Sequence, residues 1–471
     1  MRLAPILFSV ASLSIGLIAQ IIPGNSIATS INGGNTAPGE GTIWSIDNTA
    51  RTATKLTISA ALQADRPNCV TMLNGVAGYV GTNPLPANTP GNLYSIVVAG
   101  GAVTETKLNT TATAGGNVAQ IALVGTDLWF TTQNATGTGG ILQKVPAAGG
   151  PVTTVLDVST LSGYTGLANA LCAIGTKVYI GNFDSGAVAT TPGCVVVYDT
   201  VANTGSVLAT LPQGKYISGT TTFNTGLVHM QAGAGKLHLI GVYGDYLIMD
   251  TAGTVLSHVF SGSGTATAAV ANLTNSGDYD PKTGDMILGS RDGAIDRVVS
   301  GQGAEKVIIN VGTNATAANN STTGFAHIPA TTAAKDESVG GAGCATNGGF
   351  YLTDVPSGLP SAGNANYGVG CYSGTGGDLV AGLLTVAPQV PPLDLTPFGM
   401  AGCNLHLASI LVTVPGTLTG TGNGLGQFSF GLPVPASGSG AVLYRQWAEI
   451  QVTKTNTLGI VVSNARKMTI L

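Results

Sequence analysis

Three residues that could ligate a metal ion recur at one interval. His229, Asp278 and His327 lie 49 and again 49 residues apart. Two imidazoles and one carboxylate are a chemically sensible set for a divalent metal with open coordination positions. Such a metal would polarise a carbonyl group or activate water. The set therefore predicts a metal-dependent hydrolase, lactonase or lyase as one function of the chain.

The same residues also have an ordinary structural interpretation. Asp278 lies in NSGDYDPKTGD, beside Pro281 and Gly284, and this composition is typical of a β-turn. His229 in LVHMQ and His327 in FAHIP have apolar neighbours, as packed histidines do. Matching positions recur in any repeat, so equal spacing alone does not make a site. We favour this interpretation and keep the metal site as the alternative.

The interval of 49 residues belongs to a repeat that organises the first 330 residues. Each copy begins with glycine, then a variable residue, then a short apolar strand, as in GTIWSID (41–47) and GCVVVYD (193–199). The leading glycines are Gly41, Gly91, Gly139, Gly193, Gly244 and Gly293, at intervals of 50, 48, 54, 51 and 49. Periods of this length, with about four short strands in each, predict a β-propeller. We expect a six-bladed propeller over residues 25–335, with almost no helix.

The first copy lacks an innermost strand, and GFAHIPA (324–330) could supply it. A late strand that completes the first blade closes the ring and avoids two unpaired edges. His229, Asp278 and His327 would then lie on three successive blades beside the axial channel. GGFYLTD (348–354) also resembles the repeat, so seven blades remain an alternative.

A second domain is expected at 336–471, because the repeat stops in the polar, glycine-rich segment 331–343. The stretches that follow it are GCATNGGFYLTDVPSGLPSAGN, PLDLTPFGMAGCNLHLA, LYRQWAEIQ and NTLGIVVSNARKMTI. Together they resemble an uncharacterised C-terminal domain carried by many secreted proteins of environmental bacteria. The resemblance implies secretion and a β-sandwich, and it implies no reaction. The alternating strands in VLYRQWAEIQV and LGIVVSNARKMTI independently favour a sandwich.

Six cysteines, an even number, permit disulfide bonds in an exported protein. No CxxC pair is present, which argues against a thiolate zinc site. We expect Cys403 to be oxidised. Its partner is Cys344 or Cys371, and the motif YGVGC (367–371), which departs from the pattern of the similar domains, leaves this choice open.

The first 19 residues read as a secretory signal peptide, with Arg2 ahead of an apolar stretch and cleavage near Ala19. No later window approaches the length of a membrane span without polar interruption. The chain is therefore expected to be secreted, periplasmic or displayed at the cell surface. A retained N-terminal anchor is the alternative.

Composition and motifs narrow the function further. Charged residues make up only 8% of the chain and the net charge is −4, which excludes electrostatic capture of nucleic acid. The sequence contains no GxSxG elbow, no HExxH motif and no P-loop. We predict an exported, non-enzymatic binding or cell-surface scaffold protein whose propeller loops meet a surface glycan or a protein. The alternative is the metal-dependent enzyme described above.

Overall fold

The computed structural model describes residues 21, 24–32, 41–48, 52–86, 89–133, 139–164, 166–183, 193–218, 221–260, 274–290, 295–298, 304–305, 320–339, 343–346, 351–453 and 456–471. The predicted signal peptide lies outside these residues. Within them, no helix is both long and apolar enough to cross a membrane.

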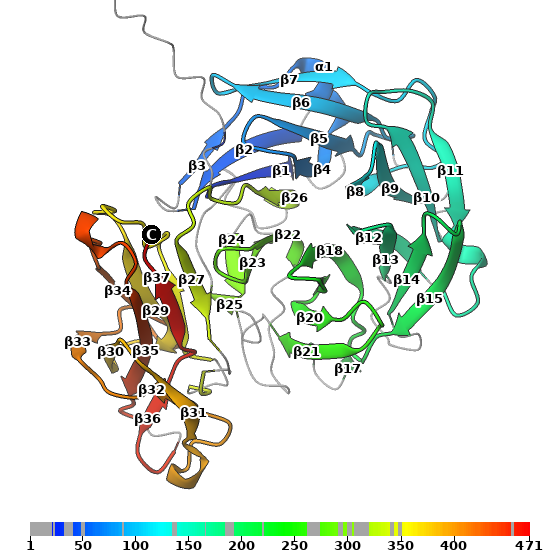
Figure 1. Cartoon of the computed structure of the whole chain (residues 1–471). Helices are drawn as coiled ribbons and strands as arrows, with labels where there is room; N and C mark the ends of the chain where they lie inside the picture. Colours follow the sequence, from blue (N-terminus) through cyan, green and yellow to red (C-terminus); the bar gives the residue numbers. More distant parts are fainter. Residues whose placement is uncertain are drawn as a thin grey trace, which may run out of the picture.

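Six four-stranded antiparallel sheets, the blades, surround one axis in the described part of the chain (Figure 1). From the axis outward, the first three blades are β26 (Asn320–His327), β1 (Ser26–Asn32), β2 (Gly41–Asp47), β3 (Thr52–Lys55); β4 (Pro67–Met72), β5 (Ala77–Thr82), β6 (Leu93–Ala99), β7 (Ala102–Lys107); and β8 (Val118–Val124), β9 (Asp127–Gln133), β10 (Gly140–Pro146), β11 (Thr153–Asp157).

The other three blades are β12 (Leu167–Ile174), β13 (Lys177–Phe183), β14 (Cys194–Asp199), β15 (Thr204–Thr210); β18 (Leu227–Gly233), β19 (Lys236–Gly241), β20 (Asp245–Met249), β21 (Val255–Phe260); and β22 (Thr274–Asp280), β23 (Asp285–Ser290), β24 (Ile295–Val298), β25 (Ala304–Glu305). The short elements between them are α1 (Ala60–Asp65), η1 (Val158–Thr160), β16 (Ile217–Ser218) and β17 (Thr221–Thr222).

The glycine-led repeat forms the same strand in every blade. Each of the six motifs supplies the third strand from the axis: β2, β6, β10, β14, β20 and β24. Strands of the middle ranks are buried along most of their length, as in DLWFTTQ of β9, because neighbouring blades cover both faces. This arrangement explains why the apolar runs show little alternation.

The ring closes as the sequence predicts. The late strand β26 pairs antiparallel with β1, with Ser26 opposite His327. The alternative of a seventh blade is not realised in the described residues, since β28 (Thr353–Pro356), from the GGFYLTD region, pairs within the C-terminal domain. In the part of the chain that the structure describes, the propeller therefore has six blades.

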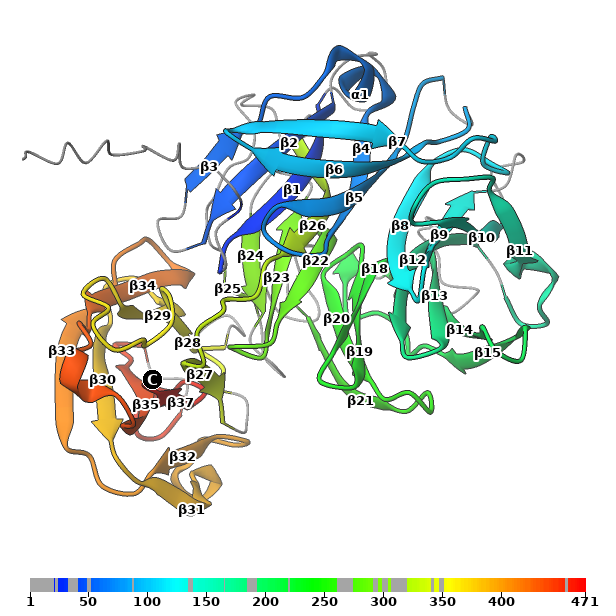
Figure 2. The same ribbon diagram turned by 45° about the horizontal axis from the view of Figure 1, so that its top comes forward.

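The C-terminal domain is a β-sandwich that lies beside the closing and sixth blades (Figures 1 and 2). One sheet contains β27 (Lys335–Ser338), β37 (Arg466–Thr469), β35 (Val442–Ile450), β30 (Leu379–Thr385) and β33 (Val412–Thr417), with β36 (Ile460–Val462) on β35. The other contains β28, β29 (Gly368–Thr375) and β34 (Asn423–Gly431), and a hairpin joins β31 (Pro388–Asp394) to β32 (Asn404–Leu407). Two short helical turns, η2 (Thr396–Phe398) and η3 (Ala436–Gly438), complete the domain.

The two sheets share one core. Val369 and Cys371 of β29 pack in the same apolar cluster as Val380 of β30 and Trp447 of β35. The predicted disulfide of Cys403 is confirmed, and its partner is Cys344. Cys371, the other candidate, is a buried thiol.

Candidate functional site

The three predicted metal ligands occupy the innermost strands of three neighbouring blades. His229 lies in β18, Asp278 in β22 and His327 in β26. These strands contact one another in that order around the axis. The equal spacing does not give equal positions along these strands. The pairing registers make Asp278 of β22 the counterpart of Gln231 in β18, and not of His229, because the turn after β22 is longer than the turn after β18. The partners of each side chain therefore decide what the set can do.

His229 is buried and its ring is bonded within the protein. Its Nε2 atom lies 3.1 Å from the amide nitrogen of Gln120, which donates to it. The ring also hydrogen bonds to the backbone of Gly277. Burial lowers the pKa of His229 to about 4, so the ring is neutral at pH 7. Because Gln120 occupies the Nε2 lone pair, that nitrogen is not presented to a metal.

Gln120, on β8, connects three inner strands. Its amide nitrogen donates to the Met230 carbonyl at 2.6 Å, and its amide oxygen accepts from the backbone N–H groups of Leu171 and Met230 at 2.8 and 3.2 Å. With the bond to His229, both hydrogens and both lone pairs of the amide are used. This side chain acts as a cross-link between β8, β12 and β18.

Asp278 makes a second cross-link. Its Oδ2 atom accepts from the backbone N–H of His327 at 2.7 Å, and the carboxylate also bonds to Gln231 of β18. Desolvation raises the pKa of Asp278 to about 6, although its hydrogen bonds with His327, Tyr279 and Gln231 act in the opposite direction. The carboxylate therefore joins the inner strands on both sides of its own.

His327 bonds to a different set of residues. Its Nδ1 atom lies 3.1 Å from Ser26 Oγ and 3.4 Å from Asn48 Nδ2, while Nε2 lies 3.6 Å from Asp280 Oδ1. The structure thus brings Asp278 to the backbone of His327, and it gives the two imidazoles separate partners. In the described residues, no group of three or more His, Cys, Asp or Glu side chains could hold a metal ion. The three-ligand metal site stays a prediction.

A polar cavity of about 200 Å³ lies where the propeller meets the sandwich. We call it the junction cavity. Its lining comes from the propeller, from the segment after β26 and from the loop between β28 and β29, and it includes Asn48, Asp280, His327, Thr332, Ser361 and Asn364. His327 is therefore a predicted site residue that also lines this cavity.

Ser26, His327 and Asp280 have the residue types of a hydrolase triad, but not its arrangement. Ser26 is fully buried and does not line the junction cavity. Its hydroxyl oxygen accepts from Asn48 Nδ2 at 2.8 Å, which fixes it inside the closing blade. A nucleophile must reach its substrate. The arrangement consequently orients the His327 ring instead of activating Ser26.

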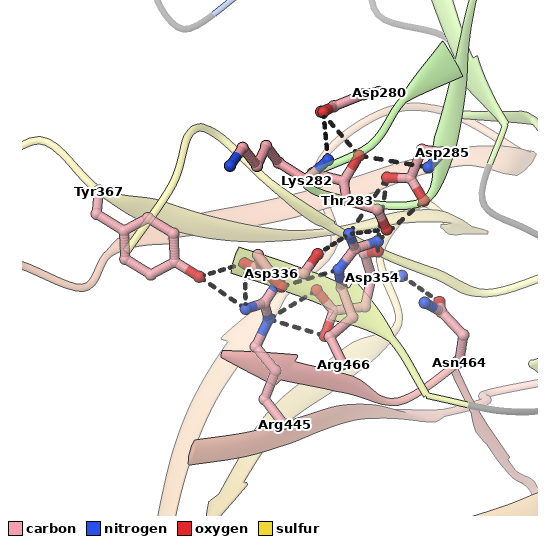
Figure 3. Close-up of polar contacts among 10 residues, drawn as sticks. All are labelled: Asp280, Lys282, Thr283, Asp285, Asp336, Asp354, Tyr367, Arg445, Asn464 and Arg466. Carbon is pink, nitrogen blue, oxygen red and sulfur yellow. Dashed lines mark hydrogen bonds and ion pairs between the residues drawn. The ribbon is translucent and has the colours of Figure 1, made fainter. Parts of the chain in front are cut away.

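A buried ionic network joins the two domains (Figure 3). Arg445 of β35 donates through Nε to Asp354 at 2.9 Å and through Nη1 to Asp336 at 2.7 Å. Burial alone would raise the pKa of Asp336, but Arg445 and Arg466 lower it overall. Tyr367 donates its hydroxyl hydrogen to the same carboxylate.

Arg466 carries this network across the domain boundary. It donates to Asp336 at 3.0 Å and to Asp285, the first residue of propeller strand β23, at 3.2 Å. All three side chains are buried. A backbone bond from Asp336 to the Lys282 carbonyl, at 3.3 Å, lies alongside. The two domains are consequently fixed to each other around the junction cavity.

Sequence reasoning missed Gln120, Asn48 and the two arginines. Gln120 and Asn48 carry no local signal, since their partners lie on other strands. Arg445 did leave one, because it lies inside the strand VLYRQWAEI in a chain with few charges. A charged residue at such a position implies a buried partner of opposite charge.

No family model and no curated protein sequence matches the chain. TolB from Acinetobacter baumannii is similar over 65% of this chain and 67% of its own, with 13% identity and a TM-score of 0.40. A proposed 6-phosphogluconolactonase from Bacteroides uniformis covers 62% of this chain and 84% of its own, with 14% identity and a TM-score of 0.39. A Lactobacillus plantarum protein covers 64% and 98%, with 12% identity and a TM-score of 0.38. At these values the likeness carries no argument about function.

Proposed function

We propose that this protein is an exported, non-enzymatic binding protein in which propeller and sandwich act as one rigid body toward a surface glycan or protein. The observation that carries the proposal is the bonding of the axial polar groups to one another. Both hydrogens and both lone pairs of the Gln120 amide form hydrogen bonds, and their partners are His229, Leu171 and Met230. Side chains engaged in this way hold strands together, which is the work of a scaffold.

The fixed domain junction supports the same proposal. A binding surface made from two domains recognises a ligand well only if the domains are already in place, because ordering them on binding costs free energy. Arg466 bonds to Asp285 on one side and Asp336 on the other, and this supplies the preorganisation. The junction cavity is then a preformed hollow on a composite surface.

Export is part of the proposal. The disulfide between Cys344 and Cys403 agrees with an oxidising compartment. Mass spectrometry of the protein purified from its native host tests this point. We expect the mature chain to begin near residue 20, and a chain that begins at Met1 or Arg2 would contradict cleavage.

The binding function is tested with the purified mature protein on an array of bacterial surface glycans and envelope proteins. We expect at least one specific ligand, with binding retained in His229→Gln and Asp278→Asn, because those residues cross-link the ring. No ligand above background would contradict the proposal.

The metal-dependent enzyme is tested on the same preparations. Bound metal at one ion per chain, together with a lactonase or esterase activity that disappears in Asp278→Asn, would replace the binding proposal with the enzymatic one.

A further inference from the structure

We propose that the junction cavity is a binding site for a small, neutral, hydroxyl-bearing ligand of about one sugar ring. The inference rests on the proposed binding function and names its ligand class. It follows from three features of the cavity: an oriented donor beside an acceptor, the absence of cationic and large aromatic side chains from the described lining, and the volume.

The donor is Nε2 of His327. Asn48 Nδ2 donates to Ser26 Oγ at 2.8 Å and lies 3.4 Å from His327 Nδ1, and an amide nitrogen can only donate. Nδ1 is then the accepting nitrogen and the ring proton is on Nε2, and His327 is among the residues that line the cavity. The tautomer is therefore set from the protein side.

The acceptor is Asp280. Its Oδ1 atom accepts from the Lys282 backbone N–H at 2.9 Å, and Oδ2 accepts from Thr283 Oγ1 at 2.8 Å. Oδ1 lies 3.6 Å from His327 Nε2, too far for a direct hydrogen bond. A ligand hydroxyl beside this gap can accept from Nε2–H and donate to Oδ1. A hydroxyl does both at once, whereas an ammonium only donates and a carboxylate only accepts.

The remaining lining narrows the ligand class. No Lys or Arg is among the described lining residues, and Asp280 supplies negative charge, so a phosphate or carboxylate ligand would find no neutralising partner. No Phe, Tyr or Trp lines the described cavity either, which disfavours a quaternary ammonium ligand. Neutral polar groups such as Asn48, Ser361 and Asn364 dominate, and they suit hydroxyl groups.

The volume sets the ligand size. About 200 Å³ is well above the roughly 10–15 Å³ that one water molecule needs. It is below the range of about 300–1,000 Å³ of sites for drug-sized ligands. One sugar ring, free or at the end of a glycan, is in keeping with this space.

Saturation-transfer NMR on the full chain tests the inference, with glucose, galactose, mannose and N-acetylglucosamine as neutral probes and inorganic phosphate and glucuronate as anionic ones. We expect transfer to at least one neutral sugar and to neither anion. Asp280→Asn should lower the affinity for that sugar by at least about tenfold, which is the contribution of one charge-assisted hydrogen bond. Ala330→Leu, which fills the cavity without removing a polar group, should abolish binding.

The matched control is Ala252→Leu, on the exposed turn between β20 and β21. It should bind sugar as the unaltered protein does, and unfolding midpoints will show that each variant is folded. Binding that survives in folded Ala330→Leu, binding of the anions instead, or binding of no probe would each overturn the inference. A ligand found on the array would still support the general binding function in each of these cases, so the two proposals can fail separately.

Discussion

The propeller and the sandwich hold their buried polar groups in different ways. In the propeller, neutral amides and single carboxylates such as Gln120 and Asp278 bond to neighbouring inner strands. In the sandwich, two arginines and two aspartates form a buried ionic network, and one disulfide spans 59 residues of chain.

This difference follows from repetition. Each blade meets a similar blade on either side, so packing around the ring is spread over many equivalent contacts. The sandwich has no repeat, and its network joins residues that are 91 to 130 positions apart. We therefore expect single substitutions to cost more in the sandwich than in the ring.

The largest effect is expected at Arg445. Arg445→Leu leaves the carboxylates of Asp336 and Asp354 buried without this partner, which should lower the free energy of unfolding by about 3–5 kcal/mol. Urea unfolding at pH 7 measures the loss. Lys335→Met breaks an exposed ion pair with Glu337 in the same sheet and should cost less than about 1 kcal/mol. Equal losses of stability in the two variants would contradict a special role for the buried ionic network.

The disulfide should give the next largest effect. Replacing Cys344 and Cys403 with alanine should cost about 2–4 kcal/mol, mainly by releasing the unfolded chain. Thiol counting in denaturant without reductant should find fewer than six reactive groups in the unaltered protein. Six reactive thiols would show that the bond is absent.

Removing a hydrogen-bonded cross-link between the inner strands of the propeller should lower the free energy of unfolding by a smaller amount. Gln120→Leu leaves backbone groups of Leu171 and Met230 without their partner and should cost about 1–3 kcal/mol. Gln213→Leu, at an exposed position, is the matched control and should change little. A loss in Gln120→Leu larger than in Arg445→Leu would reverse the ranking of the two regions.

Two buried groups, Glu449 in the sandwich and His229 in the propeller, should make contributions of opposite sign to the pH dependence of stability. Burial and the adjacent Asp378 carboxyl raise the pKa of Glu449 to about 7. The folded state then binds more protons than the unfolded state between about pH 4.5 and 7, so this contribution is lost as pH rises through that window. Unfolding free energies from pH 5 to 8 should fall less steeply in Glu449→Gln. An unchanged slope would exclude Glu449 as the cause.

His229 of the propeller should act in the other direction. Its pKa is lowered to about 4 by burial, so the unfolded state binds more protons between about pH 4 and 6.5. Stability from this residue is present above pH 6.5 and is lost as pH falls. In His229→Gln the loss between pH 6.5 and 4.5 should be smaller, and a loss of the same size would contradict the assignment.

Strand positions that follow the repeat could be predicted from the sequence, whereas side-chain contacts between residues far apart in the chain mostly could not. Glycine spacing located the third strand of each blade, and the missing inner strand located the closing strand β26. The partners of His327 could not be read in this way, because Asn48 and Ser26 reach it only through ring closure. The junction cavity needs two domains in one orientation, and Arg466 sets that orientation by bonds to residues 130 and 181 positions away.

The position of the closing strand also means that only chains long enough to contain it can complete the first blade during synthesis. Ser26 and His327 pair across 301 residues, so β1 keeps one open edge until almost the whole propeller has been synthesised. An open strand edge is a template for association with other chains. Chains cut short before Asn320 would keep that edge and should aggregate, while chains that extend past His327 can cover it themselves. A single late strand thus distinguishes chains that contain the whole propeller from shorter ones.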